Sequence, residues 1–126
     1  MERKVLVIDE GTGEGESLAA ALRLAGFGAE GTRPNAGAIH QASAMAPDLL
    51  ILVIDDGQSD AIGVGTTIAW VHGIPVIVLV DRPVEGLARR LTTVPHVRDV
   101  LRRPVPRPWL MRAIERALTA SPVPTH

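Results

Sequence analysis

Short apolar runs alternate with amphipathic stretches along the whole chain. The runs at 49–54 and 75–80 are almost continuously apolar, which is typical of strands buried on both faces of a parallel sheet. Weaker strand patterns lie at 4–9, 28–33 and 97–101. Helical spacing of apolar residues occurs at 16–25, 36–45, 57–72 (after an initial loop), 83–92 and 108–118. This strict alternation predicts an α/β domain whose parallel sheet is covered by helices on both faces.

The composition fits one domain with an aliphatic core. Of the 126 residues, 46% are hydrophobic but only 2% are aromatic, so Val, Leu, Ile and Ala must fill the interior. The absence of cysteine excludes disulfides, thiolate catalysis and Cys-ligated metals, and it favours a cytoplasmic location. No apolar run approaches the ~20 residues of a membrane span. We expect one domain over residues 1–120 and a flexible, Pro-rich tail over 121–126.

Charge is unevenly distributed, although the net charge is only −1. Residues 1–81 hold four Lys and Arg against eleven Asp and Glu, whereas residues 82–126 hold nine Arg against three acids. The last third is therefore a basic region carried by arginine alone. Arginine favours planar, bidentate contacts with carboxylates or phosphates, so this region is a candidate binding surface, with a plain solvated face as the alternative.

Polar residues follow the predicted strands at the edge where function gathers in open α/β sheets. The strand at 4–9 ends in Asp9 and Glu10, and the strand at 49–54 is followed by Asp55 and Asp56. The last strand is followed by Arg102, Arg103 and Pro104. We expect these side chains to lie near one another at the carboxyl edge of the sheet.

The segments around these strand ends resemble the receiver domain of bacterial response regulators. They read Val-Leu-Val-Ile-Asp-Glu (5–10), Pro-Asp-Leu-Leu-Ile-Leu (47–52), Ile-Pro-Val-Ile-Val-Leu (74–79) and Asp-Val-Leu-Arg-Arg-Pro (99–104). The resemblance extends over about residues 3–119. It implies a flavodoxin-like (CheY-like), doubly wound sheet of five parallel strands in the order 2-1-3-4-5, with five helices. It also implies a role in two-component signal transduction.

The resemblance fails at the positions that carry the family's chemistry. In the family, an acidic pair holds magnesium, an aspartate accepts the phosphoryl group, a Ser or Thr senses it, and an aromatic residue, a lysine and a cis proline follow. Asp9 and Glu10 keep the acidic pair, and Pro104 keeps the proline, which predicts a cis bond between Arg103 and Pro104. The other positions hold Val53 for the acceptor, Val80 for the Ser or Thr, Val100 for the aromatic residue and Arg103 for the lysine.

These replacements predict a pseudo-receiver, a protein-interaction module that works without phosphorylation, catalysis or a cofactor. Valine offers no oxygen for phosphoryl transfer. Asp9 and Glu10 without a third carboxylate should bind magnesium weakly or not at all. Arg103 is expected to form an ion pair with Asp9 or Glu10 in the former metal site, unless it points to solvent.

Two other functions remain open at this point. If the strand continues, Asp55 lies on the same side as Val53 and is a displaced phosphoacceptor, with Asp56 completing an acidic cluster. Turn formation is the alternative fate of these residues. The glycine-rich loop 11–15 has the position of a phosphate-binding loop in a nucleotide- or small-ligand-binding domain. Glu14 and Glu16 would repel phosphate, which favours a flexible surface loop.

By resemblance, the partner surface is the face formed by the fourth helix, fifth strand and fifth helix. A protein partner or a homodimer is expected there, whereas nucleic-acid binding is disfavoured and no membrane is expected to be involved. Trp70 is expected to pack inside; Trp109 is either a core residue or a contact anchor, and the histidines lie at the surface or at helix ends. The surface comprises Arg89, Arg90, Arg98, Val100, Arg102, Trp109, Arg112 and Arg116.

Overall fold

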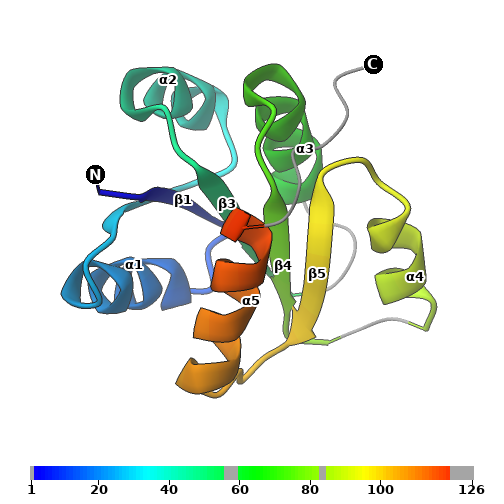
Figure 1. Cartoon of the computed structure of the whole chain (residues 1–126). Helices are drawn as coiled ribbons and strands as arrows, with labels where there is room; N and C mark the ends of the chain where they lie inside the picture. The colour runs from blue at the N-terminus through cyan, green and yellow to red at the C-terminus, as the bar shows by residue number, and fades with distance from the viewer. Residues whose placement is uncertain (1, 56–59, 83–84, 120–126) are drawn as a thin grey trace.

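A computed structural model describes residues 2–55, 60–82 and 85–119 of the chain (Figure 1). The strands are β1 (Lys4–Asp9), β2 (Gly28–Thr32), β3 (Leu49–Ile54), β4 (Val76–Val80) and β5 (Val97–Arg102). The helices are α1 (Glu14–Leu24), α2 (Ala36–Met45), α3 (Asp60–His72), α4 (Leu87–Thr92) and α5 (Arg107–Thr119). Some of the predicted features lie outside the described residues. These are Asp56, Gly57 and the tail predicted at 121–126, which includes His126.

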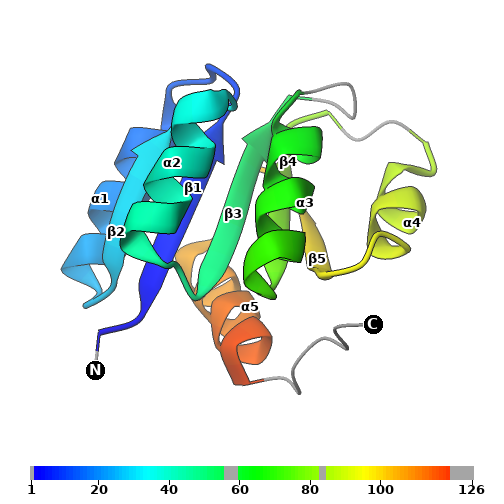
Figure 2. The same cartoon turned by 90° about the horizontal axis from the view of Figure 1, so that it is seen from above.

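The sheet confirms the predicted fold class. All five strands are parallel, in the order β2-β1-β3-β4-β5. The helices α1 and α5 cover one face, and α2, α3 and α4 cover the other (Figures 1 and 2). Every connection leads from the carboxyl edge of the sheet back to its amino edge, so the loops after the strands gather at one edge.

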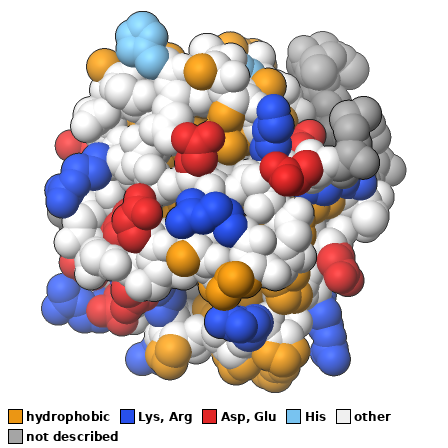
Figure 3. All heavy atoms as spheres, turned by 90° about the vertical axis from the view of Figure 1, so that its left-hand side faces the viewer, with side chains coloured by type: hydrophobic (Ala, Val, Ile, Leu, Met, Phe, Trp, Pro, Cys, Tyr) orange, Lys and Arg blue, Asp and Glu red, His pale blue; other side chains and the backbone are white. Residues whose placement is uncertain are grey.

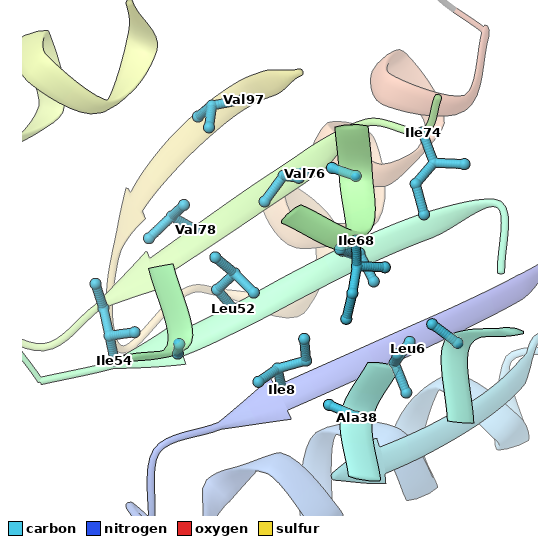
Figure 4. Close-up of a cluster of buried hydrophobic side chains, with 14 of the residues drawn as sticks. Leu6, Ile8, Ala38, Leu52, Ile54, Ile68, Ile74, Val76, Val78 and Val97 are labelled. Atoms are coloured by element: carbon cyan, nitrogen blue, oxygen red, sulfur yellow. The ribbon is translucent and has the colours of Figure 1, made fainter. Parts of the chain in front are cut away.

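Two aliphatic cores lie on opposite faces of the sheet. Along β1, Leu6 and Ile8 point to the core below α2, α3 and α4, while Val5 and Val7 point to the core below α1 and α5. This alternation follows from the two-residue period of a strand. Figure 4 shows the first core, where Ile68 of α3 packs among side chains of the central strands. The continuous apolar runs of β3 and β4 arise because both faces are covered.

Close packing between α3 and β3 depends on a glycine. A Cβ atom at Gly65 would lie 2.5 Å from Leu52 Cδ2, so a larger residue there would push the helix away from the sheet. This contact fixes the distance between α3 and the strand that ends beside the candidate site.

Trp70 and His96 differ from expectation, whereas Trp109 follows one of its two expected alternatives. Trp70 is 62% exposed, so the prediction that it packs inside is wrong: Ile68 and Ala69 occupy the inward face of α3. Trp109 is 65% exposed, which excludes a core role and leaves the contact anchor. His96 is buried rather than superficial, at 6% exposure, and lies edge-on to Trp70 with ring centroids 6.0 Å apart.

The residues that the structure describes include no helix with the length and apolar character needed to cross a membrane.

Candidate functional site

The carboxyl edge of the sheet brings the expected positions together. Asp9 at the end of β1 is in register with Val53 of β3, and Val80 of β4 is in register with Ile54 and Arg102 on its two sides. Because the strands are parallel, the residues that follow them converge at this edge. The geometry therefore places a valine directly beside the acidic residue that ends β1.

The carboxylate of Asp9 is enclosed by the loop that follows it. Its Oδ1 accepts hydrogen bonds from the backbone N–H groups of Gly11 (3.0 Å) and Thr12 (2.8 Å) and from the Thr12 hydroxyl (2.8 Å). Its Oδ2 accepts from the N–H groups of Gly13 (3.1 Å) and Gly15 (2.9 Å). A Cβ atom at Gly15 would lie 2.6 Å from the Asp9 Cβ, so the loop needs glycine to close around the side chain. The loop is thus an anion cradle filled by the chain's own aspartate.

The loop controls the ionisation of Asp9. Burial on its own would raise the pKa of this carboxyl, but the hydrogen bonds from Gly15, Thr12 and Gly11 outweigh it and hold the pKa below the ordinary value of 3.8. The charged form is therefore the one that the folded protein selects.

Replacing Asp9 with asparagine should cost about 1–3 kcal/mol near neutral pH, because an amide group would face N–H donors. The pKa of Asp9 is lower in the folded protein than the value of 3.8 in the unfolded chain. The contribution of Asp9 to the free energy of unfolding is therefore complete at pH values above 3.8, and it is lost as the pH falls through the pKa of the folded state. Urea unfolding at about pH 7 and about pH 2.5 should therefore show a difference between parent and Asp9→Asn that shrinks in acid. A difference of equal size at both pH values would contradict the cradle.

Glu10 connects the ends of β1 and β3 instead of facing a ligand site. Its Oε1 accepts a hydrogen bond from the backbone N–H of Asp55, and its own N–H donates to the Val53 carbonyl at 3.3 Å. The side chain is thereby committed to the backbone that follows β3.

Arg103 is buried and bridges three elements. Its side chain is 7% exposed; Nη1 lies 2.5 Å from Glu14 Oε2, and Nη2 lies 3.6 Å from Asp55 Oδ1. Nη2 also donates to the Ile54 carbonyl at 2.8 Å. The prediction that Arg103 pairs with Asp9 or Glu10 is wrong, because those carboxylates are engaged by the loop and by the Asp55 amide. The cis bond between Arg103 and Pro104 is present as predicted.

Sequence reasoning missed the role of Glu14. From the sequence, this residue is expected only to repel phosphate. It begins α1 at the carboxyl edge, and its side chain is 62% exposed while still reaching the Arg103 guanidinium. A signal was available, because an acidic residue in the first turn after the β1 loop lies at the same edge as the cation after β5.

The two valines offer no polar atom to the site. Val53 is 1% exposed and belongs to the core below α1 and α5, and Val80 is 1% exposed and belongs to the opposite core. Strand β3 ends at Ile54, so Asp55 lies beyond the strand, with a side chain that is 49% exposed. Asp55 is near Arg103, but the strand period that would align it with Val53 does not extend to it.

The residues described at this edge do not fit a magnesium site. Magnesium needs oxygen ligands in octahedral geometry. The Asp9 oxygens already accept five hydrogen bonds, and Glu10 is bound to a backbone amide. Within residues 2–55, 60–82 and 85–119, no three Asp, Glu, His or Cys side chains are grouped in a way that could hold a metal ion.

The predicted partner surface is exposed and rich in arginine. Helices α4 and α5 flank β5 (Figure 1). Trp109 of α5 is exposed on this surface, Val100 is partly buried against the core, and Arg116 pairs with Asp99 at 3.1 Å. The exposed arginines of these elements are Arg89, Arg90, Arg98, Arg102, Arg107, Arg112 and Arg116.

Comparison with solved structures shows the fold alone. No protein-family model and no curated protein matches the chain. A two-component response regulator from Clostridium difficile superposes with a TM-score of 0.80 at 18% identity, over 94% of this chain and 98% of that one. A response regulator receiver domain from Methanospirillum hungatei JF-1 gives 0.77 at 15% identity, over 94% of both chains. A Vibrio cholerae chemotaxis protein gives 0.75 at 17% identity, over 94% and 100%.

Proposed function

We propose that this chain is a pseudo-receiver, a protein-interaction module of two-component type that works without phosphorylation. The fold it shares with receiver domains supports the two-component setting. The single observation that carries the loss of phosphorylation is Val53, which lies beside Asp9 at the end of β3 and has no oxygen to accept a phosphoryl group. The proposal includes a cytoplasmic location, no catalytic activity and no resident cofactor.

The other groups at the edge support the same conclusion. Phosphoryl transfer needs positive charge that is free to neutralise the transferred group. Arg103, a buried cation at this edge, is neutralised by Glu14 and lies near Asp55. The carboxylates of Asp9 and Glu10 are bound within the chain. These charged groups therefore pair within the chain in a network of ion pairs and hydrogen bonds, in which Arg103 Nε is the buried atom without a partner among the described residues.

One observation favours the second candidate, a receiver phosphorylated on Asp55. This carboxylate is about half exposed and lies 3.6 Å from an Arg103 nitrogen. Among the described residues, the neighbouring carboxylates are not free to bind the metal that phosphoryl transfer requires, since Glu10 accepts from the Asp55 amide and Asp9 from the loop amides. The third candidate, nucleotide binding by loop 11–15, is disfavoured because a phosphate would have to displace the Asp9 carboxylate from the loop amides.

An acidic protein is the partner that the arginine surface fits. Exposed guanidinium groups form bidentate pairs with carboxylates, and an exposed Trp among them is a typical anchor of an interface. Two copies of this surface facing each other would bring arginines together, which disfavours a homodimer through it. A nucleic acid is disfavoured because the whole chain has a net charge of −1.

Intact mass after incubation with magnesium and acetyl phosphate tests the proposal. The parent and Asp55→Ala should both keep their unmodified mass, because neither has an acceptor supported by a metal site. A phosphoryl adduct on the parent that is lost in Asp55→Ala would replace the proposal with the second candidate.

A further inference from the structure

An apolar groove lies between α1 and α5, apart from the arginine surface. It has a volume of about 460 Å³. Apolar side chains from α1 line one side, and apolar side chains from α5 and the segment before it line the other. These are Leu18, Ala21, Leu24, Val105, Leu110 and Met111. On the side of the molecule that carries α1, hydrophobic side chains gather in the lower part, next to basic side chains (Figure 3).

Helix α1 carries apolar side chains both toward the sheet and along the groove. Gly15, Ala19 and Leu22 are buried, and Leu22 also lines the groove. Leu18 is partly buried against the core below α1 and α5. Leu18, Ala21 and Leu24 follow the helical spacing of three residues along the side that lines the groove, and Leu24 is 89% exposed. A helix that depended on the sheet alone would carry polar residues on the side that lines the groove.

The rim of the groove carries opposite charges. Glu14 at the start of α1 and Arg107 at the start of α5 both line it. Both helices begin at the carboxyl edge of the sheet, so the acid and the base lie at the same end of the groove. Glu14 is 62% exposed although it binds Arg103, so it remains accessible to a further cation.

We infer that this groove binds a second copy of the chain through the same groove. A two-fold axis along the groove places α1 of one copy against α5 of the other, and it brings Glu14 of each copy to Arg107 of the second. The surface is thus self-complementary in charge as well as apolar at its centre, as a two-fold interface requires. Charge complementarity is the reason for choosing a second copy over an unrelated helix.

The groove and the arginine surface can be occupied together. Of the described residues of α5, Arg107, Leu110 and Met111 line the groove, whereas Trp109 and Arg112 do not. A dimer formed through the groove therefore presents two arginine surfaces to acidic partners. The inference is independent of the proposed function, since it uses neither Val53 nor the Asp9 cradle.

Sedimentation velocity of the full chain over a range of micromolar concentrations tests the inference. The parent should dimerise, and Leu24→Glu should raise the dimer dissociation constant by about tenfold or more, because a charge would enter the apolar lining at the end of the groove opposite Glu14. Val71→Glu is the matched control: Val71 is 70% exposed on α3, which covers the other face of the sheet. A parent that stays monomeric over this range, or a Leu24→Glu variant that dimerises like the parent, would overturn the inference.

A second pair of variants separates the groove from the arginine surface. Arg107→Glu should weaken the dimer, because it would face Glu14 of the second copy, whereas Arg112→Glu should leave it unchanged. The reverse result would assign self-association to the arginine surface and overturn the groove, while leaving the absence of phosphorylation untouched.

Discussion

Replacing Val53 with aspartate will destabilise the domain by about 3–5 kcal/mol instead of restoring a phosphoacceptor. Val53 is 1% exposed within the core below α1 and α5. A carboxylate at this position would lie in register with Asp9, whose surrounding N–H donors are already in use. The new charge would therefore be buried without a partner and next to a charge of the same sign.

Urea unfolding of Val53→Asp and Val53→Ala separates the effect of charge from the effect of lost volume. Val53→Ala should cost about 1–2 kcal/mol, since it removes only buried methyl groups. The difference in unfolding free energy between Val53→Ala and Val53→Asp then measures the cost of burying an unpaired carboxylate. A Val53→Asp variant as stable as Val53→Ala would show that the edge can still receive a free acid, contrary to the internal network described above.

Replacing Arg103 with alanine has the second-largest expected effect, a loss of about 2–3 kcal/mol. The guanidinium joins α1, through Glu14, to the end of β3, through the Ile54 carbonyl. Its removal takes a charge-assisted hydrogen bond from the Ile54 carbonyl, which keeps only the one from the Asp81 N–H at 3.0 Å. This loss, together with the packing of the buried Arg103 side chain, accounts for most of the cost. The Glu14 pair adds little, because that carboxylate is 62% exposed and solvent screens it.

Two further variants at the same network show which contact matters. Glu14→Gln should cost less than about 1 kcal/mol, because only the exposed ion pair weakens. The loss of stability in Arg103→Lys should lie between those of Glu14→Gln and Arg103→Ala, since a single ammonium group cannot replace a planar guanidinium group that contacts two elements. Urea unfolding checks the order. A Glu14→Gln variant that loses as much as Arg103→Ala would contradict the assignment of the energy to the buried carbonyl.

Strands were predictable because burial on both faces leaves a strong pattern. The bounds of β1, β3 and α2 coincide with those expected from the sequence. The start of α4 was less accurate: Leu87 begins the helix, after Gly86, which adopts a left-handed conformation with φ of 80°. Trp70 was misplaced because α3 is apolar on several sides, so its periodicity does not select the inward face.

The site was predictable in its positions but not in its contacts. The strand ends converge as the parallel pattern requires, and the cis bond before Pro104 follows the family resemblance. The path of the loop after β1 decides which carboxylate forms an ion pair with Arg103. That loop turns the Asp9 side chain inward and brings Glu14 over Arg103. Spacing along the sequence does not determine such a path, since each of the nearby acids lies within reach of the edge.

Intact mass measured during incubation with magnesium and acetyl phosphate tests most directly whether this chain is a pseudo-receiver. Parent and Asp55→Ala proteins are compared over the same time course, with a heat-denatured parent as a control for nonspecific acetylation or phosphorylation. The internal network at the carboxyl edge predicts no phosphoryl adduct on either native protein. An adduct that forms on the native parent and disappears in Asp55→Ala would identify a working receiver with a displaced acceptor.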